Sequence, residues 1–188
     1  MLIDLPRGVR LWWADLRAAD IAAAATLPAA ERARLDELSD QAARGRRLVG
    51  ALLLQEAVRT VRGAPPGSVV EVSRTCDRCD AQHGRPVVAD GRGPHLSLAH
   101  AGLLVVVATC MGAPVGVDVE RADRFASPAE CAAWVESEAR FKAGPGAAEG
   151  VPLRVETPMP GYCAALVVAP VMSINSAGSA DGPPIGPG

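Results

Sequence analysis

The sequence lacks an excess of charge of either sign. Its 188 residues carry 19 basic and 21 acidic side chains, which gives a formal net charge of −2 and an isoelectric point near 5.9. Proteins that bind nucleic acids or anionic membranes generally display a strongly basic surface. We therefore expect no nucleic-acid partner, and only local basic patches remain open.

Long apolar runs and an even set of cysteines are also missing. Residues 1–7 show no basic stretch followed by an apolar run, and no apolar segment reaches the roughly 20 residues of a membrane span. The cysteines number five, which favours reduced thiols or a metal site over a disulfide framework. They are Cys76, Cys79, Cys110, Cys131 and Cys163. We expect a cytoplasmic protein with no membrane partner.

Lysine is almost absent. Lys142 is the only lysine among the 19 basic residues, and it follows Glu138 by four positions, so both side chains lie on one face of an expected helix. An ordinary surface ion pair is one interpretation. Lysine can release a proton whereas arginine cannot. A chain that otherwise uses only arginine therefore favours a functional role for Lys142.

The order of the elements predicts an α+β fold. Nearly half of the residues are apolar, enough for a substantial core. Helices are expected near residues 28–38, 41–61 and 127–143, and strands over 9–16, 69–72, 86–89, 102–108, 115–120 and 162–169. The strands 102–108 and 115–120 are expected to form a central hairpin through the turn at 111–114. Residues 173–188, rich in Gly, Pro, Ser and Ala, are predicted to be disordered.

Two carboxylates stand two positions apart in the segment 115–120. On a strand, Asp118 and Glu120 leave the same face while Val117 and Val119 enter the core. Two such oxygen ligands suit Mg²⁺, which completes its shell with water and phosphate. Taken alone, this pattern fits a solvated strand face better than a metal site.

A second candidate metal site lies in the loop before residue 84. Cys76, Cys79 and His83 have the spacing of half a zinc knuckle. A structural zinc ion requires four ligands, and no second pair follows. A loop with free thiols is therefore favoured over zinc, and a small zinc-stabilised binding module stays the weaker alternative.

Five short motifs occur in a specific order along the chain. They read GRRLVG at 45–50, HGRP at 83–86, LSLAHAG at 96–102, VGVDVE at 115–120 and WVESEARFKA at 134–143. Together they resemble the 4′-phosphopantetheinyl transferases of the surfactin-synthetase-activating (Sfp-like) type. That family has an arginine on its N-terminal helix, then Gly-Lys-Pro, Ser-His-Ser-Gly, Gly-(Ile/Val)-Asp-(Ile/Val)-Glu and Trp-x-x-Lys-Glu-Ala/Ser-x-x-Lys.

The resemblance implies a fold and an activity. The fold consists of two similar α+β halves related by a pseudo-two-fold axis, here residues 1–108 and a shortened second half at 109–172, with coenzyme A between them. The activity is Mg²⁺-dependent transfer of 4′-phosphopantetheine from coenzyme A to a serine of an apo acyl or peptidyl carrier protein, with release of 3′,5′-ADP.

The resemblance also implies roles for individual residues. Asp118, Glu120 and Glu138 would hold Mg²⁺ against the pyrophosphate. Glu138 would also take the proton of the carrier serine, either directly or through a metal-bound water. Lys142 would steady the pyrophosphate and protonate the leaving group. The nucleotide phosphates would be contacted by Arg46, Arg85 and His100.

The chain departs from the family pattern at several positions. Ser137 replaces the lysine before the metal-binding glutamate, and Ala99 and Ala101 replace the alcohols that flank the histidine. Only 13 residues, Arg121 to Ala133, separate Glu120 from Trp134, where the family has a longer insertion. These departures leave a second function open, that of a catalytically impaired homologue that binds coenzyme A or a carrier protein without turnover.

Overall fold

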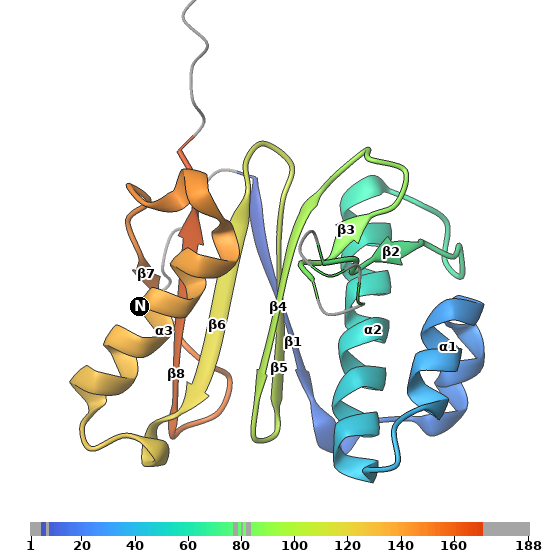
Figure 1. Cartoon of the computed structure of the whole chain (residues 1–188), viewed down its shortest axis with the longest axis horizontal. Helices are drawn as coiled ribbons and strands as arrows, with labels where there is room; N and C mark the ends of the chain where they lie inside the picture. The colour runs from blue at the N-terminus through green and yellow to red at the C-terminus, as the bar shows by residue number, and fades with distance from the viewer. Residues whose placement is uncertain (1–4, 7, 77–78, 80, 82–83, 171–188) are drawn as a thin grey trace, which may run out of the picture.

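Two antiparallel sheets lie face to face, and a helix covers the outer face of each (Figure 1). This computed structural model describes residues 5–6, 8–76, 79, 81 and 84–170. The layers run from helix α3 through the two sheets to helix α2, with helix α1 outside α2. The predicted α+β class is therefore confirmed.

The first sheet is built from strands that lie between residues 9 and 110. Its strands are β1 (Val9–Asp15), β4 (His95–Ala101) and β5 (Leu104–Cys110), in the order β1-β5-β4. Between β1 and β4 come the 3₁₀ turns η1 (Leu16–Ala18) and η2 (Ile21–Thr26), helices α1 (Ala29–Asp36) and α2 (Gln41–Arg62), and the small ribbon of β2 (Val72–Ser73) with β3 (Val87–Val88).

The second sheet is built from the residues that follow Pro114. Its strands are β6 (Val115–Arg121), β7 (Leu153–Arg154) and β8 (Tyr162–Val168), in the order β6-β8-β7. Helix α3 (Pro128–Ala143) lies between β6 and β7 in the chain, flanked by the turns η3 (Ala122–Arg124) and η4 (Pro145–Ala147). In both sheets the first strand pairs with the last, and the middle strand lies at the edge beside the last.

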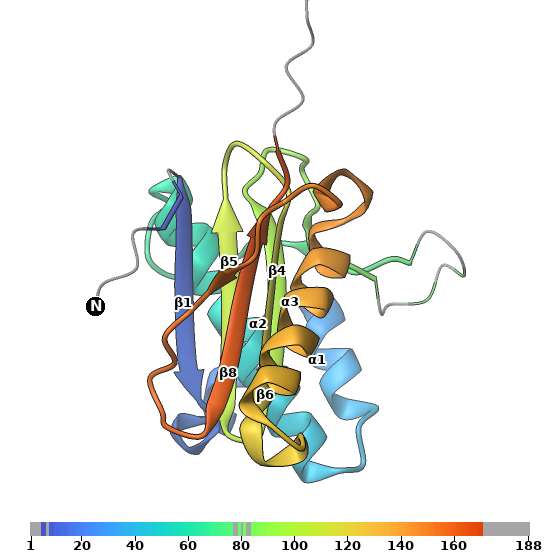
Figure 2. The same cartoon turned by 90° about the vertical axis from the view of Figure 1, so that its left-hand side faces the viewer.

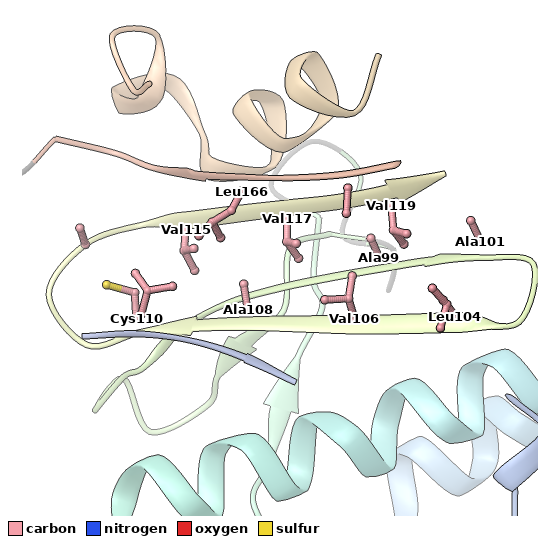
Figure 3. Packing of buried hydrophobic residues seen from close by; sticks show 13 residues of the cluster. Ala99, Ala101, Leu104, Val106, Ala108, Cys110, Val115, Val117, Val119 and Leu166 are labelled. Carbon is pink, nitrogen blue, oxygen red and sulfur yellow. The ribbon is translucent and has the colours of Figure 1, made fainter. Parts of the chain in front are cut away.

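The main core fills the space between the two sheets (Figure 3). Alternate residues of β5, such as Val106, face Val117 of β6 and Leu166 of β8, and all three are completely buried. The other residues of β5, such as Val107, face α2. Because β5 is buried on both faces, its sequence is continuously apolar instead of alternating.

Both long helices have well-defined ends. Asp40 caps α2 by accepting hydrogen bonds from the amides of Ala42 and Ala43, and Gly63 ends it in the left-handed conformation. The Ser127 side chain accepts from the amide of Glu130 at the start of α3, and Pro128 follows as the first helical residue. Such capping residues satisfy the backbone groups that would otherwise be unpaired at helix ends.

The predicted central hairpin is wrong. Strand β5 pairs with β1 and β4, and β6 pairs with β8, so the turn at 111–114 crosses from one sheet to the other. The prediction also missed β4 as a separate strand. Residues 173–188, predicted to be disordered, lie outside the described residues. No helix among the described residues combines the length and the apolarity needed to cross a membrane.

Candidate functional site

A close approach of α3 to β6 positions the candidate site. A Cβ atom on Gly116 would lie 1.9 Å from the carbonyl oxygen of Ala139 and 2.4 Å from the amide nitrogen of Ala143. Only glycine fits there, and the inner face of α3 consists of small residues such as Ala139 and Ala143. Helix α3 therefore runs directly alongside β6 and β8 (Figure 2), and its side chains reach the carboxylates of β6.

Lys142 and Asp118 form an ion pair across this contact. The Lys142 Nζ donates to Asp118 Oδ1 at 2.6 Å, and the two side chains are 29% and 8% exposed. The second oxygen, Asp118 Oδ2, is buried and accepts no hydrogen bond from the described residues. Burial raises the pKa of Asp118, Lys142 opposes this rise, and the charges of Glu120 and Glu138 add to it. The ion pair thus leaves Asp118 Oδ2 buried without a hydrogen-bond partner among the described residues.

Glu120 and Glu138 lie close enough to Asp118 to affect its pKa, but they are held differently. Glu120 accepts from Arg124 Nη1 at 2.8 Å. Glu138 is half-buried on α3, one turn before Lys142. Within the described parts of the chain, no three His, Cys, Asp or Glu side chains are arranged as a ready set of metal ligands.

These carboxylates nevertheless suit Mg²⁺. The ion usually binds one or two protein carboxylates and takes its other ligands from water and substrate phosphate, so it needs no preformed protein cage. Asp118 Oδ2 accepts no hydrogen bond from the described residues, and Glu120 and Glu138 lie close enough to affect the pKa of Asp118. The donor chemistry fits the predicted ion.

His100 and Arg46 extend the site towards the first sheet. His100 is in β4 and Arg46 in α2, where Arg46 Nη2 lies 3.7 Å from the capping residue Asp40. Although His100 is exposed on the surface, partial desolvation lowers its pKa, and the charges of Arg46, Lys142 and Arg74 lower it further. His100 therefore lies among several cations from both halves of the chain, as a site for phosphate requires.

Arg85 contacts the C-terminal end of α3. Its Nη1 donates to the carbonyl oxygen of Ala143 at 3.3 Å, beside Lys142 in the chain. A Cβ on the next residue, Gly144, would lie 2.5 Å from Arg85 Nη2. Arg85 also lines a cavity of about 400 Å³ between the residues around β3 and the start of β6. Arg85 thus lies between the end of α3 and this cavity.

Sequence analysis missed two residues that shape this site. Arg74 contributes to the low pKa of His100, and its carbonyl oxygen accepts from the amide of Gly84 at 2.7 Å, which places it next to Arg85. Ser97 Oγ accepts from the amide of Val117 at 3.0 Å and ties β4 to β6. No local pattern marks either residue, because both act through contacts distant in sequence.

The structure shows where the residues that depart from the family pattern lie. Ser137 is exposed on α3 beside Glu138. Ala99 and Ala101 pack in the core between the sheets, where a methyl group fits. The short link of 13 residues, which begins at Arg121, consists of the end of β6, η3 and the start of α3, and it still allows α3 to pack on β6.

The candidate zinc ligands are only partly described. Cys79 is exposed and Cys76 is half-buried, whereas His83 lies outside the described residues. The zinc hypothesis therefore stays a prediction.

Comparison with known proteins does not assign the chain to a family. The chain matches no model of a known protein family and no curated protein. The geometry of the site and the motif resemblance are therefore the observations that bear on its function.

Proposed function

We propose that the protein is a 4′-phosphopantetheinyl transferase that modifies a serine of an apo acyl or peptidyl carrier protein with the phosphopantetheine arm of coenzyme A. The observation that carries the proposal is the contact between Lys142 and Asp118. It brings together the only lysine and a buried carboxylate from two motifs that are 24 residues apart.

The nucleotide phosphates would bind to the basic side of the site. Arg46, Arg85 and His100 come from three separate segments. Arg46 and Lys142 both lower the pKa of His100, and Arg85 donates to the carbonyl oxygen of Ala143, next to Lys142 in the chain. Guanidinium and imidazolium groups form strong, charge-assisted hydrogen bonds with phosphate. A phosphate bound there would also restore the proton affinity of His100 that its cationic neighbours reduce.

The acidic side would hold Mg²⁺. Asp118, Glu120 and Glu138 would bind the ion, which supplies positive charge against the pyrophosphate when present. Glu120 would exchange its exposed partner Arg124 for the ion, which costs little because surface ion pairs contribute little stability.

The chain's own groups would move the two protons of the reaction. The serine oxygen of the carrier bonds to the β-phosphorus of coenzyme A, and the bond from that phosphorus to the 3′,5′-ADP oxygen breaks. Half-buried Glu138 would accept the serine proton, and Lys142 would donate a proton to the departing 3′,5′-ADP. Positioning and charge neutralisation would provide most of the rate enhancement, as in other phosphoryl transfers.

The repeated strand order supports the fold implied by the resemblance. Each sheet pairs its first strand with its last and covers its outer face with one helix. We interpret this as two halves related by a pseudo-two-fold axis, residues 1–108 and 109–172, with coenzyme A bound between them.

Mass spectrometry tests the activity directly. An apo carrier protein incubated with this protein, coenzyme A and Mg²⁺ should gain the mass of phosphopantetheine on one serine. Asp118→Asn preserves the size of the side chain and should abolish the gain. Modification by Asp118→Asn at the wild-type rate would contradict the assignment of Asp118.

A binding protein without turnover is the second candidate. Ser137 leaves position 137 without the lysine of the family pattern, and Arg124 already pairs with Glu120. Calorimetric binding of coenzyme A together with no modification of several apo carrier proteins would favour this function over the first.

A further inference from the structure

Two large aromatic side chains are exposed on the outer face of α3, the helix that covers the second sheet (Figure 1). The chain has only six aromatic residues, and all of them lie in the described part of the chain. Trp134 and Phe141 are 51% and 77% exposed, whereas the other four are partly buried. Side chains seven positions apart lie on the same face of a helix, two turns from each other. A chain with few aromatic residues thus leaves two of them exposed on one helical face.

Phe125 extends this exposed surface. It follows η3, shortly before the start of α3, and its ring centre lies 6.2 Å from that of Trp134 in a tilted arrangement. We call Phe125, Trp134 and Phe141 the aromatic patch. Single exposed apolar side chains are common on protein surfaces. Aromatic residues gathered at one place are instead typical of surfaces that bind other proteins, because rigid rings bury a large area at little cost in entropy.

The aromatic patch adjoins the candidate site at Glu138. Trp134, Glu138 and Lys142 follow one another at intervals of four residues, so each lies one turn beyond the last along α3. Trp134 is exposed, Glu138 is half-buried, and Lys142 reaches inwards to pair with Asp118. Phe141 lies three residues after Glu138, on the exposed side of the helix. Glu138 therefore lies between the shielded ion pair and the aromatic patch.

We propose that the aromatic patch is the docking surface for the carrier protein, where it contacts apolar side chains that lie beside the serine to be modified. This inference rests on the proposed transferase function. In that function the serine oxygen must come within about 3 Å of the Glu138 carboxylate. Coenzyme A would bind on the inner side of Glu138, next to Lys142 and Asp118. The serine must then approach Glu138 from its outer side.

The outer side of Glu138 is flanked by the two exposed rings. Side chains three or four positions apart on a helix have Cβ atoms about 5–6 Å from each other. Trp134 and Phe141 stand at these spacings before and after Glu138. A serine carried on a protein surface therefore cannot reach Glu138 unless that surface also covers both rings. A few aromatic residues of this kind contribute most of the affinity in typical protein interfaces.

Steady-state kinetics with an apo carrier protein tests the docking surface. Trp134→Ala and Phe141→Ala should each raise the KM for the carrier about tenfold and leave the KM for coenzyme A within about twofold of the wild type. The matched control is Ile21→Ala, which removes a side chain that is also 77% exposed but lies in η2, on the α2 side of the molecule. It should change neither KM.

Phe141→Ala is the variant that decides this test. Trp134 contacts Phe125, so thermal unfolding must show that Trp134→Ala is folded before its kinetics are interpreted. Phe141 is 77% exposed, and its replacement removes little packing. An unchanged KM for the carrier in Phe141→Ala would overturn the proposal. Sedimentation of the protein alone tests a second copy of the chain as the occupant. A dimer that Phe141→Ala dissociates would assign the patch to self-association and would also overturn the proposal.

Binding without turnover separates the docking surface from the proposed function. A carrier whose serine is replaced by alanine cannot be modified, and surface plasmon resonance measures its affinity. We expect the wild type to bind this carrier and Phe141→Ala to bind it about tenfold more weakly. The same loss of binding in a protein that modifies no apo carrier would support the docking surface and contradict the transferase function. Modification of carriers together with equal binding by both proteins would overturn the docking surface alone. Neither binding nor modification by the wild type would contradict both.

Discussion

Lys142 of α3 and Asp118 of β6 are joined by a hydrogen-bonded ion pair of 2.6 Å that is mostly shielded from water. One carboxylate oxygen is satisfied by the ammonium group, and the other is buried without a partner among the described residues. In the proposed function this second oxygen would bind Mg²⁺.

Replacement of Lys142 tests its role as an acid. Lys142→Arg keeps the positive charge beside Asp118 but cannot release a proton. We expect kcat for carrier modification to fall by at least about 100-fold, with a much smaller change in the KM for coenzyme A. Steady-state kinetics of the two proteins measures this. A kcat within a few-fold of the wild type would limit Lys142 to charge neutralisation.

The pH dependence of stability tests the burial of Asp118. Its pKa in the folded state lies above the ordinary value of 3.8, mainly because of burial. Asp118 therefore contributes stability below that value and loses it as the pH rises through the folded pKa. As the pH rises from below 3.8 to neutral, the free energy of unfolding of Asp118→Asn should increase relative to that of the wild type.

Urea unfolding of both proteins at constant ionic strength provides this measurement. Glu156→Gln, which replaces an exposed carboxylate shortly after β7, is the control. If the free energy of unfolding of Asp118→Asn instead decreases relative to the wild type as the pH rises, the effect of Lys142 on the pKa of Asp118 is larger than that of burial.

Replacement of Arg85 tests the placement of the nucleotide. Arg85→Ala removes a guanidinium that would form charge-assisted hydrogen bonds with phosphate. We expect the KM for coenzyme A to rise about tenfold or more and the KM for the carrier to change little. Because Arg85 also donates to Ala143, thermal unfolding must show that the variant is folded. A larger change in the carrier KM would place the nucleotide elsewhere.

Protonation of His100 should accompany coenzyme A binding. Partial desolvation and then Arg46 lower its pKa below the ordinary 6.5, so the free protein keeps His100 neutral near neutral pH and loses stability as the pH falls below 6.5. A bound phosphate raises the pKa again, and the complex takes up a proton. Calorimetry in buffers of different ionisation enthalpy should show greater proton uptake for the wild type than for His100→Gln. Equal uptake would remove His100 from the phosphate site.

Ser137 offers a test by gain of function. Ser137→Lys restores a positive charge next to Glu138 on the exposed side of α3, and we expect the rate of carrier modification to rise about threefold. Ala133→Lys, one turn earlier and also exposed, is the matched control and should have no effect. Glu138→Gln should reduce modification to background. Background modification by all of these proteins and the wild type would favour the binding function.

Local sequence determined the helices and the composition of the site. Ser127, Pro128 and Gly144 set the ends of α3, and alternation on a strand placed Asp118 and Glu120 on one face, because capping and strand periodicity depend only on neighbours in the chain. The scarcity of lysine singled out Lys142 before any contact was known.

Strand pairing and the meeting of distant groups were decided only by the tertiary structure. The segment containing β5 is apolar on both faces, so its pattern does not specify a partner, and the expected hairpin with β6 is replaced by pairing with β1 and β4. The proximity of His100 to Arg46 and Lys142 likewise depends on how the two sheets and α3 pack. Periodicity describes which face of an element is buried, but the element that covers that face is selected by shape and by long-range packing.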